Sequence, residues 1–208
     1  MLAEGRTGLI SAADGSVNPV RLDKTGATTI VSAHPLYSEA VLRGNMFCCS
    51  TAVAGVAPGT ALSTTPPITL LNPFNSGVQL VILKTSLGYI SGTLGSGTVV
   101  YAYVTPQATI PTGGTELTSI CTMIGQVHGK GRVFQGSTLT GTPLILRSAY
   151  NMGAGLATSV DFIRTCQDLL EGEFIVPEGT CFVMQGIAAA GTTPLVLMGL
   201  VWEEMLYI

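Results

Sequence analysis

The stretch ITLLNPFNSGVQLVILK, residues 68–84, contains the pattern that decides the fold. Two short runs of β-branched and aliphatic residues flank residues 72–77, where Asn, Pro, Ser and Gly are typical turn formers. This pattern predicts two β-strands joined by a turn. It recurs along the chain after Asn45.

Ten short strands are predicted in this way, separated by segments rich in Gly, Pro, Asn, Ser and Thr. They span residues 46–53, 68–71, 78–84, 87–93, 99–105, 117–124, 144–149, 173–176, 181–187 and 195–203. Helical patterns are too scarce for parallel βαβ folds, so the prediction is an all-β fold, an antiparallel, jelly-roll-like β-sandwich over residues 45–208.

One segment, residues 160–170, has a pattern that is compatible with a helix. Its apolar residues recur at helical spacing, Thr158 and Asp161 resemble a capping box, and Gly172 could end the helix. A segment without a helix is the alternative there.

The first 44 residues differ from the rest, because charged residues, Pro and Gly follow one another with little periodicity. We expect residues 1–44 to form an extended N-terminal arm. Ordering its backbone costs about 1–2 kcal/mol per residue, which its own sandwich, a neighbouring subunit or a capsid must offset. Arg6, Arg21, Lys24 and Arg43 are the candidate partner contacts in the arm, with solvated surface as the alternative.

Charge is scarce and unevenly placed. Only 10% of the residues are charged, 47% are hydrophobic, and between Gly44 and Thr115 the one Asp, Glu, Lys or Arg is Lys84. This composition excludes a disordered chain or a coiled coil, and it predicts a homo-oligomer, a trimer or a dimer, with contacts on that half of the sandwich. A net charge of −3 argues against direct binding to nucleic acid.

The uncharged run from Gly179 to Trp202 is long enough for a membrane helix, but it contains the turn residues Gly191 and Pro194. We therefore interpret it as strand, turn and strand, with no membrane partner. The N-terminus has no signal-peptide pattern, which predicts synthesis and assembly in a cytoplasm.

Five cysteines without a C-x-x-C motif, and two histidines that stand far apart, predict no metal site and no cofactor. An odd number of cysteines fits thiols that stay reduced.

Three patterns resemble catalytic or binding motifs, each with a simpler alternative. Residues 88–92, GYISG, place Ser91 one position later than a nucleophile elbow requires, and a bend in a glycine-containing strand is the favoured explanation. Residues 125–131, GQVHGKG, resemble a phosphate loop but lack its spacing and its Ser or Thr, so a solvated basic loop is the alternative.

The third pattern is a group of acidic residues that could pair for glycoside hydrolysis or bind calcium. It comprises Asp161, Asp168, Glu171, Glu173 and Glu178. A charged rim or a subunit contact is the alternative. Trp202, the single Trp, is expected to be an anchor in the core or in a partner contact.

Several turn-and-strand phrases resemble structural proteins of tailed-bacteriophage virions, of the jelly-roll kind that decorate or cement capsids. The phrases are LNPFNSGVQLVI at 71–82, IVPEGT at 175–180, GTTPL at 191–195 and LVWEE at 200–204. The resemblance covers residues 45–208. It implies a β-sandwich, oligomerisation, contacts with a major capsid protein and a location in the virion; it implies no active site.

The leading hypothesis is therefore a capsid decoration or cement protein. A tail, baseplate or receptor-binding component of a virion is the second hypothesis. The third is a cellular jelly-roll enzyme or lectin. Such a protein would need several histidines or exposed aromatic residues, and both are scarce in this sequence.

Overall fold

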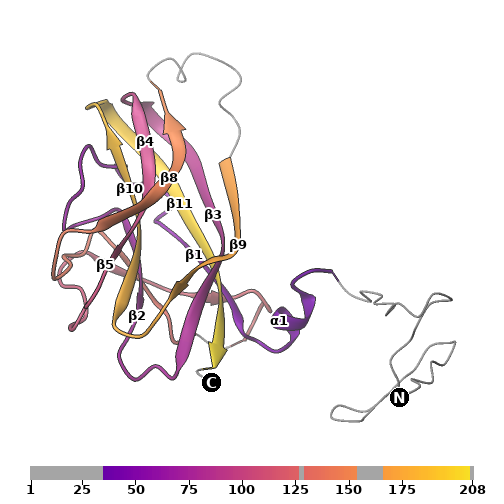
Figure 1. Cartoon of the computed structure of the whole chain (residues 1–208). Coiled ribbons are helices and arrows are strands. Elements are labelled where there is room, and N and C mark those ends of the chain that lie inside the picture. Colours follow the sequence, from indigo (N-terminus) through magenta and orange to yellow (C-terminus); the bar gives the residue numbers. More distant parts are fainter. Residues whose placement is uncertain (1–34, 127–128, 154–165, 207–208) are drawn as a thin grey trace, which may run out of the picture. The chain divides into compact units, whose positions relative to one another are not determined.

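The computed structural model describes residues 35–126, 129–153 and 166–206. From Ala40 onward these residues form one compact unit, in which two antiparallel sheets face each other (Figure 1). The predicted all-β sandwich is confirmed. The single described helix, α1 (Ser38–Leu42), precedes the first strand.

One sheet has five strands in the order β6-β1-β11-β3-β9, and the other has six in the order β5-β7-β2-β10-β4-β8. The five-stranded sheet consists of β1 (Met46–Ser50), β3 (Val78–Thr93), β6 (Ile120–Cys121), β9 (Cys166–Val176) and β11 (Thr192–Leu206). The six-stranded sheet consists of β2 (Ile68–Asn72), β4 (Gly97–Val104), β5 (Thr115–Leu117), β7 (Arg132–Gln135), β8 (Leu144–Met152) and β10 (Thr180–Ala188).

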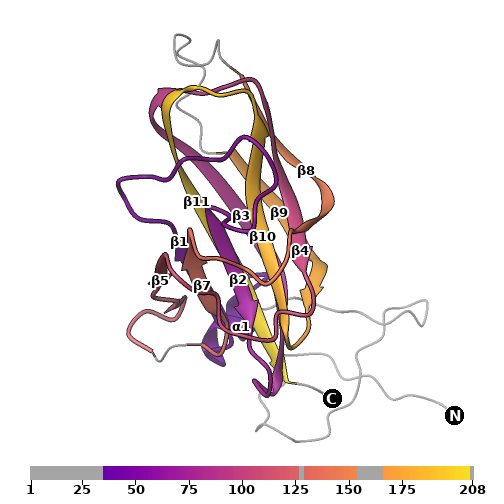
Figure 2. The same ribbon diagram turned by 90° about the vertical axis from the view of Figure 1, so that its left-hand side faces the viewer.

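The strand order is that of a jelly roll. Apart from β5, β6 and β7, which all lie in the connection from β4 to β8, eight strands remain, in the orders β1-β11-β3-β9 and β2-β10-β4-β8. The chain thus alternates between the sheets except at the β4–β8 step, which is the jelly-roll arrangement. Figure 2 shows the two layers from the side, with the long loop between β1 and β2 standing out from them.

The main core lies between the sheets. Its largest fully buried side chains include Trp202, Tyr101 and Phe182. β2 is buried at all five positions, including the polar residues Thr69 and Asn72, so its sequence shows no alternation of apolar and polar residues. Burial of β2, β3 and β4 thereby accounts for much of the missing charge between Gly44 and Thr115. The contacts between copies predicted for residues 44–115 stay a prediction. The scarcity of charge in this segment no longer supports them by itself, because burial within the subunit explains much of it.

The turn in the opening stretch ties three strands together. Asn72 is fully buried, and its Nδ2 donates to the carbonyls of Val78, at 2.8 Å, and Val176, at 2.9 Å. Across the turn the backbone N–H of Gly77, a residue at φ 74°, donates to Glu178 Oε1 at 2.7 Å. The side chain of one buried amide therefore fixes where β2, β3 and β9 meet.

Two strand predictions need correction, and one strand was missed. The strands expected at 78–84 and 87–93 are one strand, β3, which continues through an irregular step at Leu83 where its register with β9 and β11 shifts. The strand expected at 117–124 is divided between β5 and β6, and β7 was not predicted.

The sequence left a helix possible at residues 160–170. Residues 166–170 instead begin β9, and residues 160–165 lie outside the described part of the chain. Cys166 to Leu169 pair antiparallel with the segment of β3 from Leu87 to Lys84. Pairing with a neighbouring strand here overrides the local apolar spacing.

Candidate functional site

The serine motif lies within β3 and forms no elbow. Ser91 is exposed and pairs with Leu195 of β11, and Gly92 follows at φ 82°. A nucleophile elbow needs a sharp turn from a strand into a helix, which this segment is not. The strand interpretation is the one that the structure supports.

The glycine-rich loop already holds an anion, which is the chain's own Glu204. This carboxylate is 8% exposed, and it accepts hydrogen bonds from the backbone N–H groups of Lys130, at 2.9 Å, and Gly131, at 2.8 Å. These amides are the groups that a phosphate loop would offer to a ligand. Residues 127–128 lie outside the described chain. In the described part, the resemblance to a phosphate loop reflects an internal carboxylate clamp.

Trp202 belongs to the core. Its side chain is 0% exposed, it stacks on Phe47 with ring centroids 6.1 Å apart, and its indole N–H points to Glu204 at 3.4 Å. Of the two roles considered for Trp202, the structure places it in the core and away from the surface that a partner could reach.

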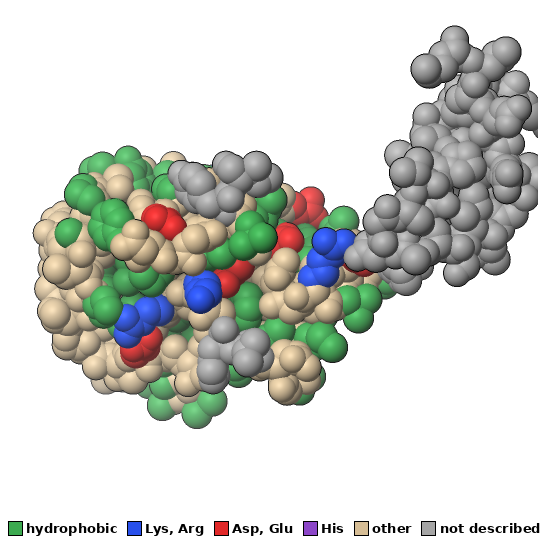
Figure 3. All heavy atoms as spheres, turned by 90° about the horizontal axis from the view of Figure 1, so that it is seen from below, with side chains coloured by type: hydrophobic (Ala, Val, Ile, Leu, Met, Phe, Trp, Pro, Cys, Tyr) green, Lys and Arg blue, Asp and Glu red, His purple; other side chains and the backbone are tan. Residues whose placement is uncertain are grey.

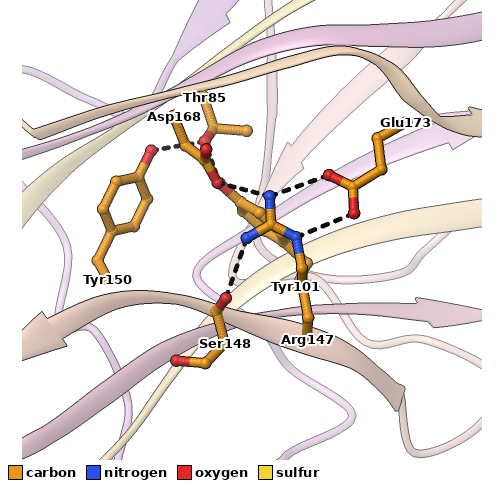
Figure 4. Close-up of polar contacts among 7 residues, drawn as sticks. All are labelled: Thr85, Tyr101, Arg147, Ser148, Tyr150, Asp168 and Glu173. Carbon is orange, nitrogen blue, oxygen red and sulfur yellow. Dashed lines mark hydrogen bonds and ion pairs between the residues drawn. The ribbon is translucent and has the colours of Figure 1, made fainter.

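Two of the acidic residues are brought together by an arginine that the sequence did not single out (Figure 4). Arg147 of β8 donates to Asp168 at 2.9 Å and to Glu173 at 3.0 Å, both of β9. Because β8 and β9 are edge strands of different sheets, this ion pair closes one side of the sandwich. The Arg147 guanidinium also lies over the ring of Tyr101, 5.1 Å from its centroid.

A network of hydroxyl groups continues from the ion pair into the core. Tyr101 donates to Asp168 at 2.9 Å, and Thr85 lies within hydrogen-bond distance of both Tyr101 and Tyr150. Burial raises the pKa of Tyr101 and of Tyr150 above their ordinary value, so both stay neutral at physiological pH. The Asp168 carboxylate is thus held by an arginine and a phenol, and the network has the character of a structural strap.

The remaining acidic residues do not join this pair. Glu178 caps the turn at residues 75–77, Glu171 is exposed, and Asp161 lies outside the described chain. Paired carboxylates for glycoside chemistry need a free acid and a free base facing each other. With Arg147 between Asp168 and Glu173, the arrangement does not offer that pair.

Beside the strap lies an apolar surface, which we call the edge surface. It consists of five exposed residues, Leu144, Ile145 and Leu146 of β8 and Leu169 and Ile175 of β9. They do not all share one face, because Ile145 pairs with Ala102 on the outer face of the six-stranded sheet, whereas Leu169 and Ile175 point outward from the five-stranded sheet. Their exposed fractions range from 39% at Leu146 to 60% at Leu144. Three consecutive exposed aliphatic residues at a sheet edge are unusual, because edges are commonly protected by charge.

A groove of about 440 Å³ continues the edge surface. Tyr103, Leu146, Phe174, Ile175 and Pro177 are among the residues that line it. Apart from Glu173 at its rim, the lining carries no ionisable carboxylate or amine. Its chemistry suits an apolar side chain rather than a charged ligand.

A larger hollow, of about 740 Å³, lies under the β1–β2 loop. Gln185 and Gln135 are its large polar side chains, and both are used by the loop itself. Gln185 Nε2 donates to the carbonyl of Ala61 at 2.6 Å, and Gln135 Oε1 accepts from the N–H of Ala52 at 2.9 Å. No aromatic side chain lines it on which a sugar could stack.

The predicted partner contacts are placed only in part. Arg43 is exposed after α1, whereas Arg6, Arg21 and Lys24 lie outside the described residues. The edge surface was missed from the sequence. Its signal was the run Leu144-Ile145-Leu146 next to Arg147, which reads as an ordinary buried strand until the sheet order places it at an edge.

Within residues 35–126, 129–153 and 166–206, no group of three or more His, Cys, Asp or Glu side chains could hold a metal ion. The described helices include none with the length and apolarity needed to cross a membrane. No protein-family model, no curated protein and no solved structure matches the chain.

Proposed function

We propose that this chain is a structural protein of a bacteriophage virion that decorates or cements the capsid through contacts between copies and through its N-terminal arm. The observation that carries the proposal is the edge surface, a set of exposed apolar residues on the two edge strands of the sandwich, beside an apolar groove. Exposed apolar surface of this kind is typical of sites that contact another protein.

Three further features support the proposal. The jelly-roll strand order is common among virion proteins, although lectins and cupins share it. The candidate catalytic motifs hold structural contacts, as in the Glu204 clamp and the Arg147 strap. The resemblance of the turn phrases to virion proteins points to the same role.

Low surface charge fits permanent assembly. Figure 3 shows one face of the molecule, on which hydrophobic and uncharged side chains outnumber small groups of Lys, Arg, Asp and Glu. Many copies on one shell would add weak contacts into strong attachment.

The test is immunogold electron microscopy of phage particles from the source of the sequence, with antibodies raised against residues 45–208. Label spread over the capsid is expected. Label confined to the tail or baseplate would instead support the second hypothesis, and particles without label would overturn a virion role. Mass spectrometry of purified particles serves as the independent control for antibody specificity.

A further inference from the structure

We infer that the bulges and the inward-facing charges of β8 and β9 protect these two edge strands, so that an extended segment of another chain does not continue either sheet there. The protection acts on the backbone edges of the strands. Contacts that the exposed side chains make with another protein stay possible, so this role is independent of the proposed function.

The two sides of the sandwich differ in the length of their edge strands. On one side the edge strands are β5, with three residues, and β6, with two. On the other side they are β8, with nine residues, and β9, with eleven. A very short edge strand offers few free backbone groups, whereas a long apolar one is a ready site for pairing with another chain. The side formed by β8 and β9 is therefore the one that needs protection.

β8 is bulged twice along its length. Val99 and Val100 are neighbours on β4, but their partners on β8 are separated by Ala149. Leu146 is inserted in the same way nearer the start of the strand. Each bulge bends the strand and interrupts the even row of N–H and C=O groups along its backbone. The free edge of β8 thus offers no regular ladder over its whole length.

β9 is interrupted by a longer bulge. Its residues 170–173 lie opposite the single residue Leu83 of β3. Within this bulge Glu171 has φ 47° and Gly172 has φ 94°, so both lie in the left-handed region. A strand needs extended backbone, and a residue other than glycine is strained at positive φ. The free edge of β9 is therefore broken in the middle of the strand.

Charge adds to the effect of the bulges. Arg147 pairs across the sheet with the fully buried Tyr101, so its side chain lies on the inner face of β8 and reaches Asp168 and Glu173 of β9 (Figure 4). These three charged side chains are only partly exposed. A strand added at either edge would cover them and remove them from water, which costs free energy. Inward-facing charge is one of the means by which edge strands avoid pairing.

The experiment straightens β8 by deleting Leu146 and Ala149 from the full chain, which leaves every other residue of β8 its partner on β4. In sedimentation velocity over a concentration series, the straightened variant is expected to associate at least about tenfold more tightly than the wild type, a gain of about 1.4 kcal/mol. Leu146→Ala/Ala149→Gly is the matched control, because it removes the same side chains and keeps both bulges. It should sediment like the wild type.

A rescue variant separates strand pairing from general stickiness. Adding Ile145→Lys to the straightened variant should restore the sedimentation of the wild type, because a lysine on an edge strand opposes pairing. A straightened variant that is folded by circular dichroism and sediments like the control overturns the inference.

Hydrogen exchange tests the wild-type chain without any variant. Backbone amides of residues 144–149 and 168–173 that exchange rapidly in dilute protein should exchange equally fast in concentrated protein. In the straightened variant the amides of β8 should become protected as the concentration rises. Protection of these amides in the concentrated wild type would show that its edges do pair, and would overturn the inference even if the deletions prevent folding.

Discussion

Two apolar regions of the sandwich differ in how far the chain covers them. The outer face of the six-stranded sheet carries a second hydrophobic cluster, which the chain covers itself. The cluster comprises Leu71, Ala102, Val104, Phe134, Leu139, Cys181 and Val183, none more than 6% exposed. The edge surface, on β8 of this sheet and on β9 of the other, carries aliphatic residues that are 39–60% exposed. Only the first region is closed within the subunit.

A loop and its hydrogen bonds cover the outer face of the six-stranded sheet. Leu139 comes from the loop before β8, and Gln107, 2% exposed, anchors that loop by accepting the N–H of Thr140 at 3.0 Å. The N–H of Gln107 in turn donates to the carbonyl of Gly179 at 2.7 Å. Among the described residues no such loop covers the edge surface, whose five apolar side chains stay 39–60% exposed.

The largest difference between the two regions is expected in how fast their cysteine thiols are alkylated. Cys181 lies in the covered face, where burial raises its pKa to about 12, whereas Cys166 is exposed at the start of β9. At pH 8 a thiol with that pKa is a thiolate about once in 10⁴ molecules, and burial also blocks access. Iodoacetamide followed by mass spectrometry should therefore modify Cys166 in the folded protein and Cys181 only in denaturant. Rapid labelling of Cys181 without denaturant would mean that the covered face opens.

The second largest difference is expected between truncations of one side chain in each region, measured as the loss in free energy of unfolding. Leu139→Ala should lower the free energy of unfolding by about 2–5 kcal/mol, because it opens a cavity in a buried cluster. Ile145→Ala removes a half-exposed side chain and should cost about 0.5 kcal/mol or less. Urea unfolding of dilute protein, where association adds little, is the measurement. Equal losses would show that the two regions are not different in the isolated subunit.

The glutamine that anchors the loop gives a smaller effect. Gln107→Ala should cost about 1 kcal/mol, since it removes the buried side chain that accepts the N–H of Thr140 and donates to the carbonyl of Thr109. Gln167→Ala, at an exposed position of β9, is the control and should be nearly neutral. A neutral Gln107→Ala in the same urea series would contradict the anchoring role.

How far the sequence predicts this comparison depends on the element. Short apolar runs and turn residues such as Asn72 and Gly77 predict the sandwich, because turn chemistry is local. The edge surface was not predictable in the same way. Leu144 to Leu146 are an aliphatic run at the start of β8, as Leu70 and Leu71 are within buried β2, and only long-range pairing decides which strand is central and which lies at an edge.

The functional motifs show the same limit. The glycine-rich loop suggested an anion site, and an anion is there, but it is Glu204 from a strand more than 70 residues away. The acidic group suggested paired carboxylates, yet Arg147 stands between two of its members. In both cases the partner comes from a distant strand, so spacing along the sequence carries no signal for it.

The Arg147 strap should contribute modestly to stability. Arg147→Met removes two ion pairs but keeps an apolar stem over Tyr101, and we expect a loss of about 1 kcal/mol, because the pair is partly exposed. A double-mutant cycle with Glu173→Gln, measured by urea unfolding, should give a coupling of about 0.5 kcal/mol. Zero coupling would show that the strap is an incidental surface contact.

The smallest effect is expected at Glu116 and Arg132, an exposed pair between β5 and β7 at the opposite end of the same sheet. Hydrogen bonding to Arg132 holds the pKa of Glu116 below its ordinary value of 4.5. A lowered pKa means that the pair stabilises the folded state fully above the unfolded pKa, and that this contribution is lost as the pH falls through the lowered folded pKa. Glu116→Gln should therefore be less stable than the wild type at pH 7, by about 0.5 kcal/mol at most given solvent screening. The difference should shrink at acid pH, below the ordinary carboxyl pKa. Thermal melts of both proteins from pH 7 to pH 3 test the sign, and a difference that grows on acidification would show that Glu116 has no favourable partner in the folded state.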